Sequence, residues 1–326
     1  MNEKHMNDID NLSFSDIFGF FWKKRKLIVK ITGTFTLLFI AISLLIPNTY
    51  TSSSLLLVAQ QKTQQNNMSG LSALTGFSSG ALQSSLIKRD ADFSIAVLES
   101  RDFVEHIISK GDFLPALMAT KSFDHETGEI IFDDNLYLVE SKKWIRKKVP
   151  VPTILETHKV YLRHLNVSYD KLTGHISISF EHLSPIFAYE FLSTVIKELN
   201  DIARNSDFND AKKSLIFLNE QARTNTVAQV NDTISNLMEE QLNKQMIANV
   251  SEDYLLKVID KPFIPEKKSS PRRTYIAIFG VIFGLFISIF WIIFYNIVPN
   301  NYKQKIDKYL SFFQFKKISQ FNPFKN

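Results

Sequence analysis

A serine between two glycines is the first candidate for chemistry in the sequence. The segment GFSSG, residues 76–80, fits the G-x-S-x-G pattern, in which a sharp turn between a strand and a helix exposes a nucleophilic serine, here Ser78. Residues 60–85 are rich in Gln, Ser, Gly and Asn, and no apolar strand precedes Ser78. The pattern is therefore interpreted as a chance match, and a membrane-anchored enzyme that uses Ser78 is kept as an alternative.

No other pattern predicts a catalytic, cofactor or metal site. Cysteine is absent, which excludes disulfides, thiolate metal ligands and cysteine nucleophiles. His158 and His164 are six residues apart, whereas the zinc-binding H-E-x-x-H helix needs a separation of four. The acidic segment DHETGEIIFDDN lacks calcium-loop spacing and is typical of a surface turn. The sequence contains no G-x-x-x-x-G-K-[ST] phosphate loop and no pattern that pairs two carboxylates for glycoside chemistry. We therefore expect no enzyme, no cofactor and no metal.

The net charge of +5 is unevenly distributed along the chain. Residues 1–46 carry a net charge of +2, residues 47–273 carry −2 and residues 274–326 carry +5. A nucleic-acid-binding protein would concentrate its cations on the folded part. Cations that flank apolar runs indicate a membrane protein instead, and nucleic acid is not expected as a partner.

Two apolar runs are long enough to cross a bilayer. Leu27 to Ile46 is a run of 20 residues with one charge, and Thr274 to Val298 is a run of 25 residues with none. A helix of 20 residues is about 30 Å long, which matches a hydrocarbon core. The first run is too long for a signal peptide and no A-x-A site follows it. Both runs are therefore predicted to be transmembrane helices.

The flanking charges predict the orientation. The cluster KKRK, residues 23–26, precedes the first run, so the positive-inside rule places the N-terminus in the cytoplasm. Lys267, Lys268, Arg272 and Arg273 conflict with this rule, but long loops translocate largely regardless of charge. The expected organisation of this two-pass protein is a cytoplasmic N-terminus (1–26), a first span (27–46), a periplasmic α+β domain (47–273), a second span (274–298) and a short basic cytoplasmic tail (299–326). The tail is either an interfacial helix or disordered.

The periplasmic part is predicted to combine a sheet with long helices. Residues 50–59 and 254–260 are strand-like and could pair into a mixed sheet close to the membrane. Residues 166–180 form a hairpin pattern, and residues 90–110 have helical spacing. Ser184 and Pro185 begin another helix as its N-cap and first residue. From about 207 to 250 a thin apolar stripe predicts a long helix that projects from the domain or packs against neighbouring chains.

A proline-rich joint precedes the second span. Pro262, Pro265 and Pro271 fix φ and donate no backbone hydrogen bond, so they stiffen an extended connection. Within the span, Gly280 and Gly284 form a G-x-x-x-G face, which lets two membrane helices approach closely. We expect this face to pack against the chain's own first span or against a neighbouring copy.

The ordered set of these residues resembles the signature at the second span of polysaccharide co-polymerases, the Wzz-type chain-length determinants. The residues that carry the resemblance are Pro262, Pro265, Ser270, Pro271, Arg272, Gly280 and Gly284. In that family the cation after Ser-Pro is usually lysine, and the glycine cluster is larger. The layout is also similar, as are LSFSDIFGFFWKKRK before the first span, LESRDF at residues 98–103 and VIDKP at residues 258–262. The resemblance covers most of residues 10–300.

The resemblance implies a bacterial inner-membrane protein that assembles into a ring-like homo-oligomer. It implies a non-enzymatic co-polymerase that sets the modal length of a lipid-linked glycan, such as the O-antigen of lipopolysaccharide, made by a separate integral-membrane polymerase. Relatives in capsule export carry a tyrosine kinase after the second span. Only 28 residues follow here, without a phosphate loop, so the kinase-fused type is not expected. The alternative is a capsule or exopolysaccharide export co-polymerase whose kinase is a separate chain.

Overall fold

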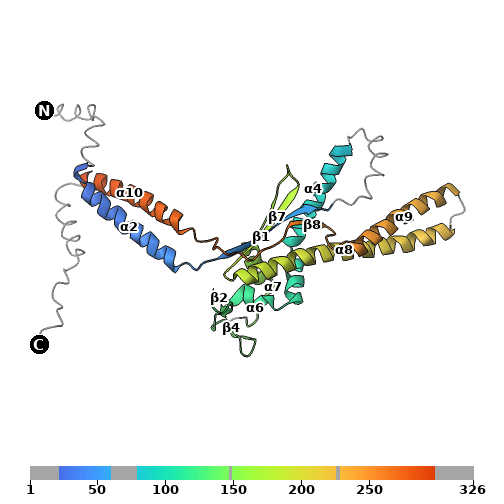
Figure 1. The fold of residues 1–326 in the computed structure, drawn as a ribbon, viewed down its shortest axis with the longest axis horizontal. Coiled ribbons are helices and arrows are strands. Elements are labelled where there is room, and N and C mark those ends of the chain that lie inside the picture. The colour runs from blue at the N-terminus through green and yellow to red at the C-terminus, as the bar shows by residue number, and fades with distance from the viewer. Residues whose placement is uncertain (1–21, 60–78, 147–148, 225–227, 298–326) are drawn as a thin grey trace, which may run out of the picture. The chain divides into compact units, whose positions relative to one another are not determined.

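The computed structural model describes residues 22–59, 79–146, 149–224 and 228–297 (Figure 1). The chain divides into two compact units. The helix-pair unit consists of residues 1–46 and 271–326, and the sheet unit consists of residues 47–270.

The helix-pair unit is built from α2 (Arg25–Leu45) and α10 (Arg273–Ile297), which pack against each other along their length. Both are long and apolar enough to cross a membrane. At 1.5 Å per residue, α2 is about 31 Å long and α10 about 37 Å long. Phe35 and Phe39 of α2 meet Phe279 and Phe283 of α10 with ring centroids 5.8–5.9 Å apart.

The sheet unit contains a four-stranded sheet in the order β6-β7-β1-β8. The strands are β1 (Tyr50–Val58), β6 (Leu165–Tyr169), β7 (His175–His182) and β8 (Leu256–Asp260). The prediction that the first and last strands pair is confirmed, because β8 runs antiparallel to β1. The prediction of a mixed sheet is wrong, since β6–β7 and β7–β1 are antiparallel as well. A tight turn with Gly174 at φ 72° joins β6 to β7, which explains that hairpin without a crossover.

One face of the sheet is covered by the first half of α8 (Pro185–Thr224). Ser184 caps this helix by accepting a hydrogen bond from the Phe187 N–H at 3.2 Å, as predicted. Alternate residues of β1 and β7 point toward the helix and are buried, as the two-residue period of a strand requires. The centre of this core is Phe180 against Phe191, with ring centroids 4.5 Å apart.

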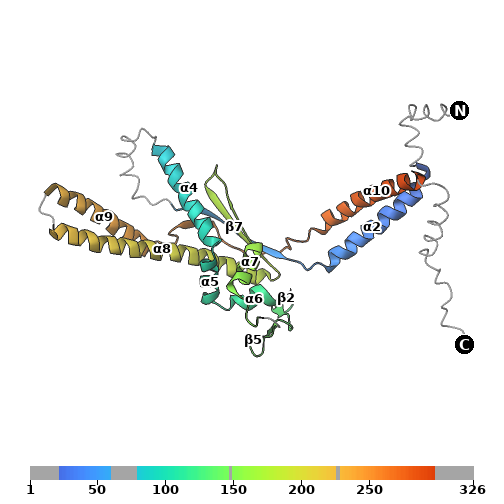
Figure 2. The same cartoon turned by 180° about the vertical axis from the view of Figure 1, so that it is seen from behind.

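Shorter elements complete the core (Figure 2). They are α4 (Ser79–Leu98), α5 (Arg101–Lys110), α6 (Phe113–Ala119), α7 (Ile154–His164) and the strands β2 (Thr120–Phe123), β3 (Ile130–Phe132), β4 (Tyr137–Leu138) and β5 (Lys143–Trp144).

The single helical stretch predicted at 90–110 is in fact two helices. Ser100 has extended backbone angles and caps α5 by accepting from the Phe103 N–H, so it ends the preceding helix.

The prediction of one long helix from about 207 to 250 is wrong. Helix α8 runs without interruption from Pro185 to Thr224, and α9 (Ala228–Val250) folds back along its outer part (Figures 1 and 2). This pairing covers the apolar stripe only in part, because Ile234 is buried whereas Leu237 and Leu242 stay exposed. At the root of this helical hairpin, Asp207 accepts from the Tyr254 hydroxyl at 2.7 Å and pairs with Lys244 at 2.9 Å.

Candidate functional site

The proline-rich joint is an extended strap, residues 261–270, that continues from β8 along β1. The backbone ladder between the two strands covers only Leu55–Val58 of β1 and stops at Asp260. Pro262 and Pro265 lie just beyond this point and have no N–H to donate, so a regular ladder cannot continue. Other donors must hold the strap in place.

Two serine hydroxyls of β1 supply these donors. Ser54 donates to the Asp260 carbonyl at 2.6 Å, and Ser52 donates to the Phe263 carbonyl at 2.8 Å. Both serines are buried, with 3% and 0% of their surface exposed. The serine-rich sequence of β1 is explained by this role, because small hydroxyl side chains donate to carbonyls at the point where the regular backbone ladder ends. The strap is therefore bound to the strand along its length.

The end of the strap is joined to the start of β1 by backbone hydrogen bonds. Thr49 N–H donates to the Ser270 carbonyl at 3.0 Å, and Ser269 N–H donates to the Thr49 carbonyl at 2.8 Å. This bridge lies four residues after the end of α2 and three residues before the start of α10 in the sequence. The two segments that lead to the apolar helices thus run side by side within the sheet unit.

Side chains from β7 and the β2–β3 turn support the same end of β1. The Thr49 hydroxyl donates to the Glu181 carboxylate, and the Tyr50 hydroxyl is hydrogen-bonded to His125 Nε2 at 2.9 Å. His125 also packs edge-to-face against Phe123, with ring centroids 5.0 Å apart. The start of the strand is therefore fixed from both sides, by the strap and by the turn.

A second contact zone lies within the helix-pair unit. Gly280 and Gly284 of α10 are buried against α2. A Cβ added at Gly284 would lie 2.9 Å from Thr32 Cα and 3.1 Å from the Thr32 carbonyl oxygen. A Cβ at Gly280 would lie 3.0 Å from Phe39 Cβ. The structure thus places the G-x-x-x-G face against the chain's own first apolar helix, the first of the two partners expected for it.

The signature residues divide between these two zones. Pro262, Pro265 and Ser270 belong to the strap, whereas Pro271, Arg272, Gly280 and Gly284 belong to the helix-pair unit. Pro265 and Pro271 are buried and Arg272 is exposed. Ser78 lies outside the described residues.

A buried asparagine was missed by sequence reasoning. Asn200 of α8 is only 4% exposed, and its Oδ1 accepts from the N–H groups of Leu255 and Leu256 at 2.9 and 2.8 Å. Its Nδ2 donates to the Leu256 carbonyl at 3.1 Å. The side chain therefore ties the first residues of β8 to α8. A polar residue on the otherwise apolar face of the predicted helix was the available signal.

The buried histidine His182 has structural partners at both ring nitrogens. His182 accepts from the Ser184 N–H through Nδ1 and donates to the Ala116 carbonyl through Nε2, both at 3.0 Å. Burial lowers its pKa to about 4, so the ring is neutral near pH 7, and both nitrogens are occupied. Among the described residues, no three His, Asp or Glu side chains come together in a way that could hold a metal ion.

Glu198 of α8 is held by two side chains of α5. His106 Nε2 lies 2.7 Å and Lys110 Nζ lies 3.2 Å from its carboxylate. Burial raises the pKa of Glu198, but the hydrogen bonds from His106 and Lys110 outweigh this effect and the pKa is lowered. The cluster joins two helices and leaves no carboxylate poised as an acid.

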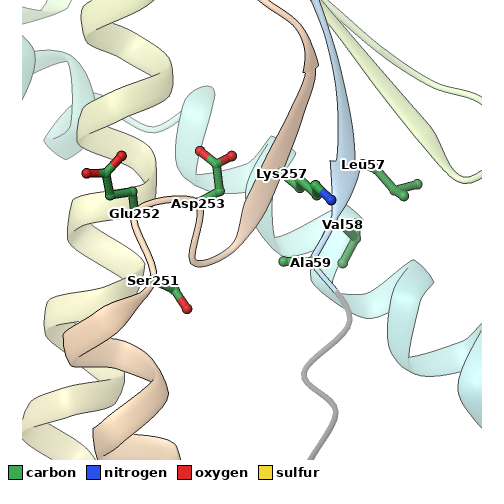
Figure 3. A pocket seen from close by; sticks show the side chains of 7 residues that line it. All are labelled: Leu57, Val58, Ala59, Ser251, Glu252, Asp253 and Lys257. Atoms are coloured by element: carbon green, nitrogen blue, oxygen red, sulfur yellow. The ribbon is translucent and has the colours of Figure 1, made fainter.

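A cleft of about 640 Å³ lies at the other end of β1 (Figure 3). It is lined by Leu57, Val58, Ala59, Ser251, Glu252, Asp253 and Lys257. Asp253 accepts a long hydrogen bond from the Val258 N–H at 3.4 Å and thereby supports the start of β8. The cleft contains neither an aromatic platform nor a pair of facing carboxylates on separate elements, so its lining predicts no glycoside chemistry.

Comparisons with known proteins identify the first third of the chain. Residues 10–110 match the family model of the Wzz chain length determinant protein. Among solved structures, the chain is similar to a full-length bacterial polysaccharide co-polymerase, with 11% identity, coverage of 87% of this chain and 97% of that chain, and a TM-score of 0.35. It is also similar to a fragment of WzzB, a polysaccharide co-polymerase from Salmonella Typhimurium, with 13% identity, coverage of 68% and 100%, and a TM-score of 0.29. No curated protein matches the sequence significantly.

Two apolar helices that are long enough to cross a membrane flank a helix-rich α+β body. Over residues 10–110 the chain matches the model of the Wzz chain length determinant protein, so the resemblance to Wzz-type chain-length determinants is confirmed for that part of the chain. This region includes α2, β1 and α5 and ends before the strap and α10. The roles of the signature residues are therefore argued from their geometry alone.

Proposed function

We propose that the chain is a non-enzymatic co-polymerase that sets the modal length of a lipid-linked surface polysaccharide, the O-antigen of lipopolysaccharide, made by a separate polymerase. The chain length determinant region at residues 10–110 carries the proposal. The strap supports it, because a stiff connection between the sheet unit and the second apolar helix suits a protein that acts through its position at a membrane rather than through a reaction.

The proposed placement is a two-pass protein of the bacterial inner membrane. Helices α2 and α10 cross the bilayer, both termini lie in the cytoplasm and the sheet unit lies in the periplasm. The cluster KKRK before α2 and the lysines after α10 support this orientation. A reporter enzyme that is active only outside the cytoplasm, fused within the strand–helix connection at residues 183–184, is expected to be active. Activity of a cytosol-specific reporter at that site would contradict the placement.

The proposed assembly is a ring-like homo-oligomer in contact with an integral-membrane polymerase and its lipid-linked glycan. The outer parts of α8 and α9 support self-association, because Ile216, Phe217 and Leu237 expose large apolar surfaces there. Cross-linking of the full chain in membranes, followed by electrophoresis, is expected to give a ladder that ends at one defined oligomer.

The decisive experiment compares glycan lengths with and without the gene. Deletion is expected to replace a lipopolysaccharide ladder that has a preferred length by one that has none. The double variant Gly280→Leu/Gly284→Leu is expected to shift the preferred length, because it separates α10 from α2. An unchanged ladder after deletion refutes the O-antigen role. A changed capsule together with a co-purified cytoplasmic kinase supports the export co-polymerase instead.

A further inference from the structure

The strap has a charge pattern that neither its fold nor its proposed function explains. Residues 261–273 contain five Lys and Arg residues against one Glu. They lie on the side of the apolar helices that carries the large domain, where the positive-inside rule does not call for cations. Residues 47–61, which leave α2 toward the same domain, contain no charged residue. The positive charge next to the helices on this side is thus concentrated in the strap, which contains three lysines, and in Arg272 and Arg273, which follow it.

Hydrogen bonds join one end of the strap to the segment that follows α2 in the sequence. Lys268 Nζ donates to Asn48 Oδ1 at 3.4 Å, and the neighbouring Ser269 N–H donates to the Thr49 carbonyl at 2.8 Å. Asn48 is the third residue after Leu45, the last residue of α2. An extended chain advances about 3.3 Å per residue, so Asn48 is within about 10 Å of the end of that helix. The polar layer on each side of a hydrocarbon core is about 5–8 Å thick. When α2 spans the core, Lys268 with its long flexible stem is therefore within reach of the lipid headgroups.

The two lysines are not neutralised by the protein. Lys267 and Lys268 are both exposed. Within the described part of the chain, no carboxylate forms a salt bridge with either ammonium group. The bond from Lys268 to Asn48 involves a neutral amide, so the positive charge stays uncompensated. Two adjacent ammonium groups within reach of the headgroups match the chemistry of a phosphate-bearing lipid surface.

We propose that Lys267 and Lys268 bind the phosphate groups of anionic glycerophospholipids in the leaflet next to the sheet unit. Lysine suits this contact, because its flexible stem follows the apolar surface while the ammonium group reaches a phosphate oxygen. A net negative headgroup is preferred over a zwitterionic one, since only the former neutralises both ammonium groups. The contact holds the strap, and the start of β1 bound to it, at a fixed height above the hydrocarbon core. It requires that α2 and α10 cross a membrane, but it does not depend on which glycan the protein serves.

The test uses the full chain in a non-ionic detergent and measures bound lipid by native mass spectrometry. Short-chain phosphatidylglycerol and short-chain phosphatidylcholine are titrated separately. The variant Lys267→Gln/Lys268→Gln is expected to weaken phosphatidylglycerol binding about five-fold or more, the effect of losing one or two surface charges. Its binding of phosphatidylcholine is expected to stay unchanged. Lys267→Arg/Lys268→Arg is expected to bind phosphatidylglycerol like the unmodified protein.

The matched control is Lys212→Gln/Lys213→Gln, which removes a tandem pair of exposed lysines on α8. It is expected to leave phosphatidylglycerol binding unchanged. Equal losses in the strap variant and the control variant overturn the proposal, because they show a general charge effect. Unchanged phosphatidylglycerol binding in the strap variant also overturns it. A third titration uses a short-chain isoprenoid diphosphate. If the strap variant loses binding of this lipid and not of phosphatidylglycerol, the proposal is also overturned, since that result assigns the lysines to a glycan carrier.

Discussion

Thr49 and Ser270 form an antiparallel backbone bridge, although 221 residues separate them in the sequence. The bridge brings the segment that follows α2 and the segment that precedes α10 together at one end of the sheet. Residues that hold the strap to β1 are therefore expected to affect both segments at once. The following predictions concern these contacts and the packing on which they depend.

Loss of the serine hydroxyls is expected to loosen the strap. Ser54→Ala removes the donor to the Asp260 carbonyl, and Ser52→Ala removes the donor to the Phe263 carbonyl. Both hydrogen bonds are part-buried, and a typical hydrogen bond contributes about 0.5–1.5 kcal/mol, so each variant should lower the free energy of unfolding by about that amount. The measurement is chemical unfolding of the full chain in detergent. Ser53→Ala is the control, because Ser53 lies between the two serines and points to the other face of the strand. A similar loss in all three variants would contradict the role of the strap contacts.

Addition of one methyl group is expected to have unequal effects at the two glycines of α10. At Gly284 the new Cβ meets the backbone of Thr32, at 2.9 Å from Cα, and a backbone cannot turn aside. At Gly280 the nearest atom is Phe39 Cβ at 3.0 Å and the nearest backbone atom is Thr36 Cα at 3.3 Å, so a smaller shift of α2 relieves the contact. Gly284→Ala should therefore destabilise the helix pair by about 1–3 kcal/mol, and Gly280→Ala should cost less.

The readout for these glycine variants is the thermal midpoint of the full chain in detergent. Phe286→Ala serves as the control, since Phe286 is largely exposed on α10. Equal midpoints for Gly280→Ala and Gly284→Ala would contradict the prediction that the packing against α2 is tighter at Gly284.

Truncation of Asn200 is expected to release β8 from α8. Asn200→Ala leaves the N–H groups of Leu255 and Leu256 and the Leu256 carbonyl without their side-chain partner. The cost should exceed the loss of one bond and reach about 3 kcal/mol, because several buried groups lose a partner together. Hydrogen exchange should accelerate at Leu255 and Leu256. Lys197→Ala, at an exposed position of the same helix, should leave exchange at both amides unchanged. Slow exchange at both amides in Asn200→Ala would refute this role.

The stability of the sheet unit is expected to depend on pH through His182. Burial lowers the pKa of this residue from 6.5 to about 4. Its contribution is complete above pH 6.5 and is lost as the pH falls toward 4, because only the unfolded chain binds the extra proton in that range. The full loss corresponds to about 3 kcal/mol. Chemical unfolding at pH 7 and pH 5 measures the effect.

His182→Gln tests the assignment, because glutamine keeps one donor and one acceptor but does not titrate. The variant should lose most of the difference in unfolding free energy between pH 7 and pH 5. His175→Gln, at the other end of the same strand, should keep that difference. A pH dependence that persists fully in His182→Gln would place its origin elsewhere.

Features with a local signal were predictable from the sequence. The cap formed by Ser184 and the helix start at Pro185 follow from backbone chemistry within four residues, and both are confirmed. The turn with Gly174 and the alternation of β7 predicted the hairpin for the same reason. The apolar lengths of α2 and α10 are equally local properties.

Features that depend on distant partners were not predictable in this way. The apolar stripe after residue 207 predicted helix but could not show that α9 returns along α8, since periodicity does not reveal a reversal of direction. The serines of β1 lie in a segment that the sequence predicted as a strand, but nothing near them in the sequence indicates their hydrogen-bond partners. Their partners, Asp260 and Phe263, are more than 200 residues away, so the reason for them appears only in three dimensions.

The length of the helical hairpin formed by α8 and α9 can change without a change in the sheet from which it projects. The contacts of Asp207 with Lys244 and Tyr254 anchor its root, and the sheet contacts of α8 lie on the other side of that anchor. Removal of seven residues from each helix beyond the anchor would shorten the arm by about 10 Å and would nearly preserve the facing sides, because seven residues are close to two turns. Paired insertions or deletions in α8 and α9 can therefore change how far the hairpin extends, while the sheet, the strap and the apolar helices keep their sequence.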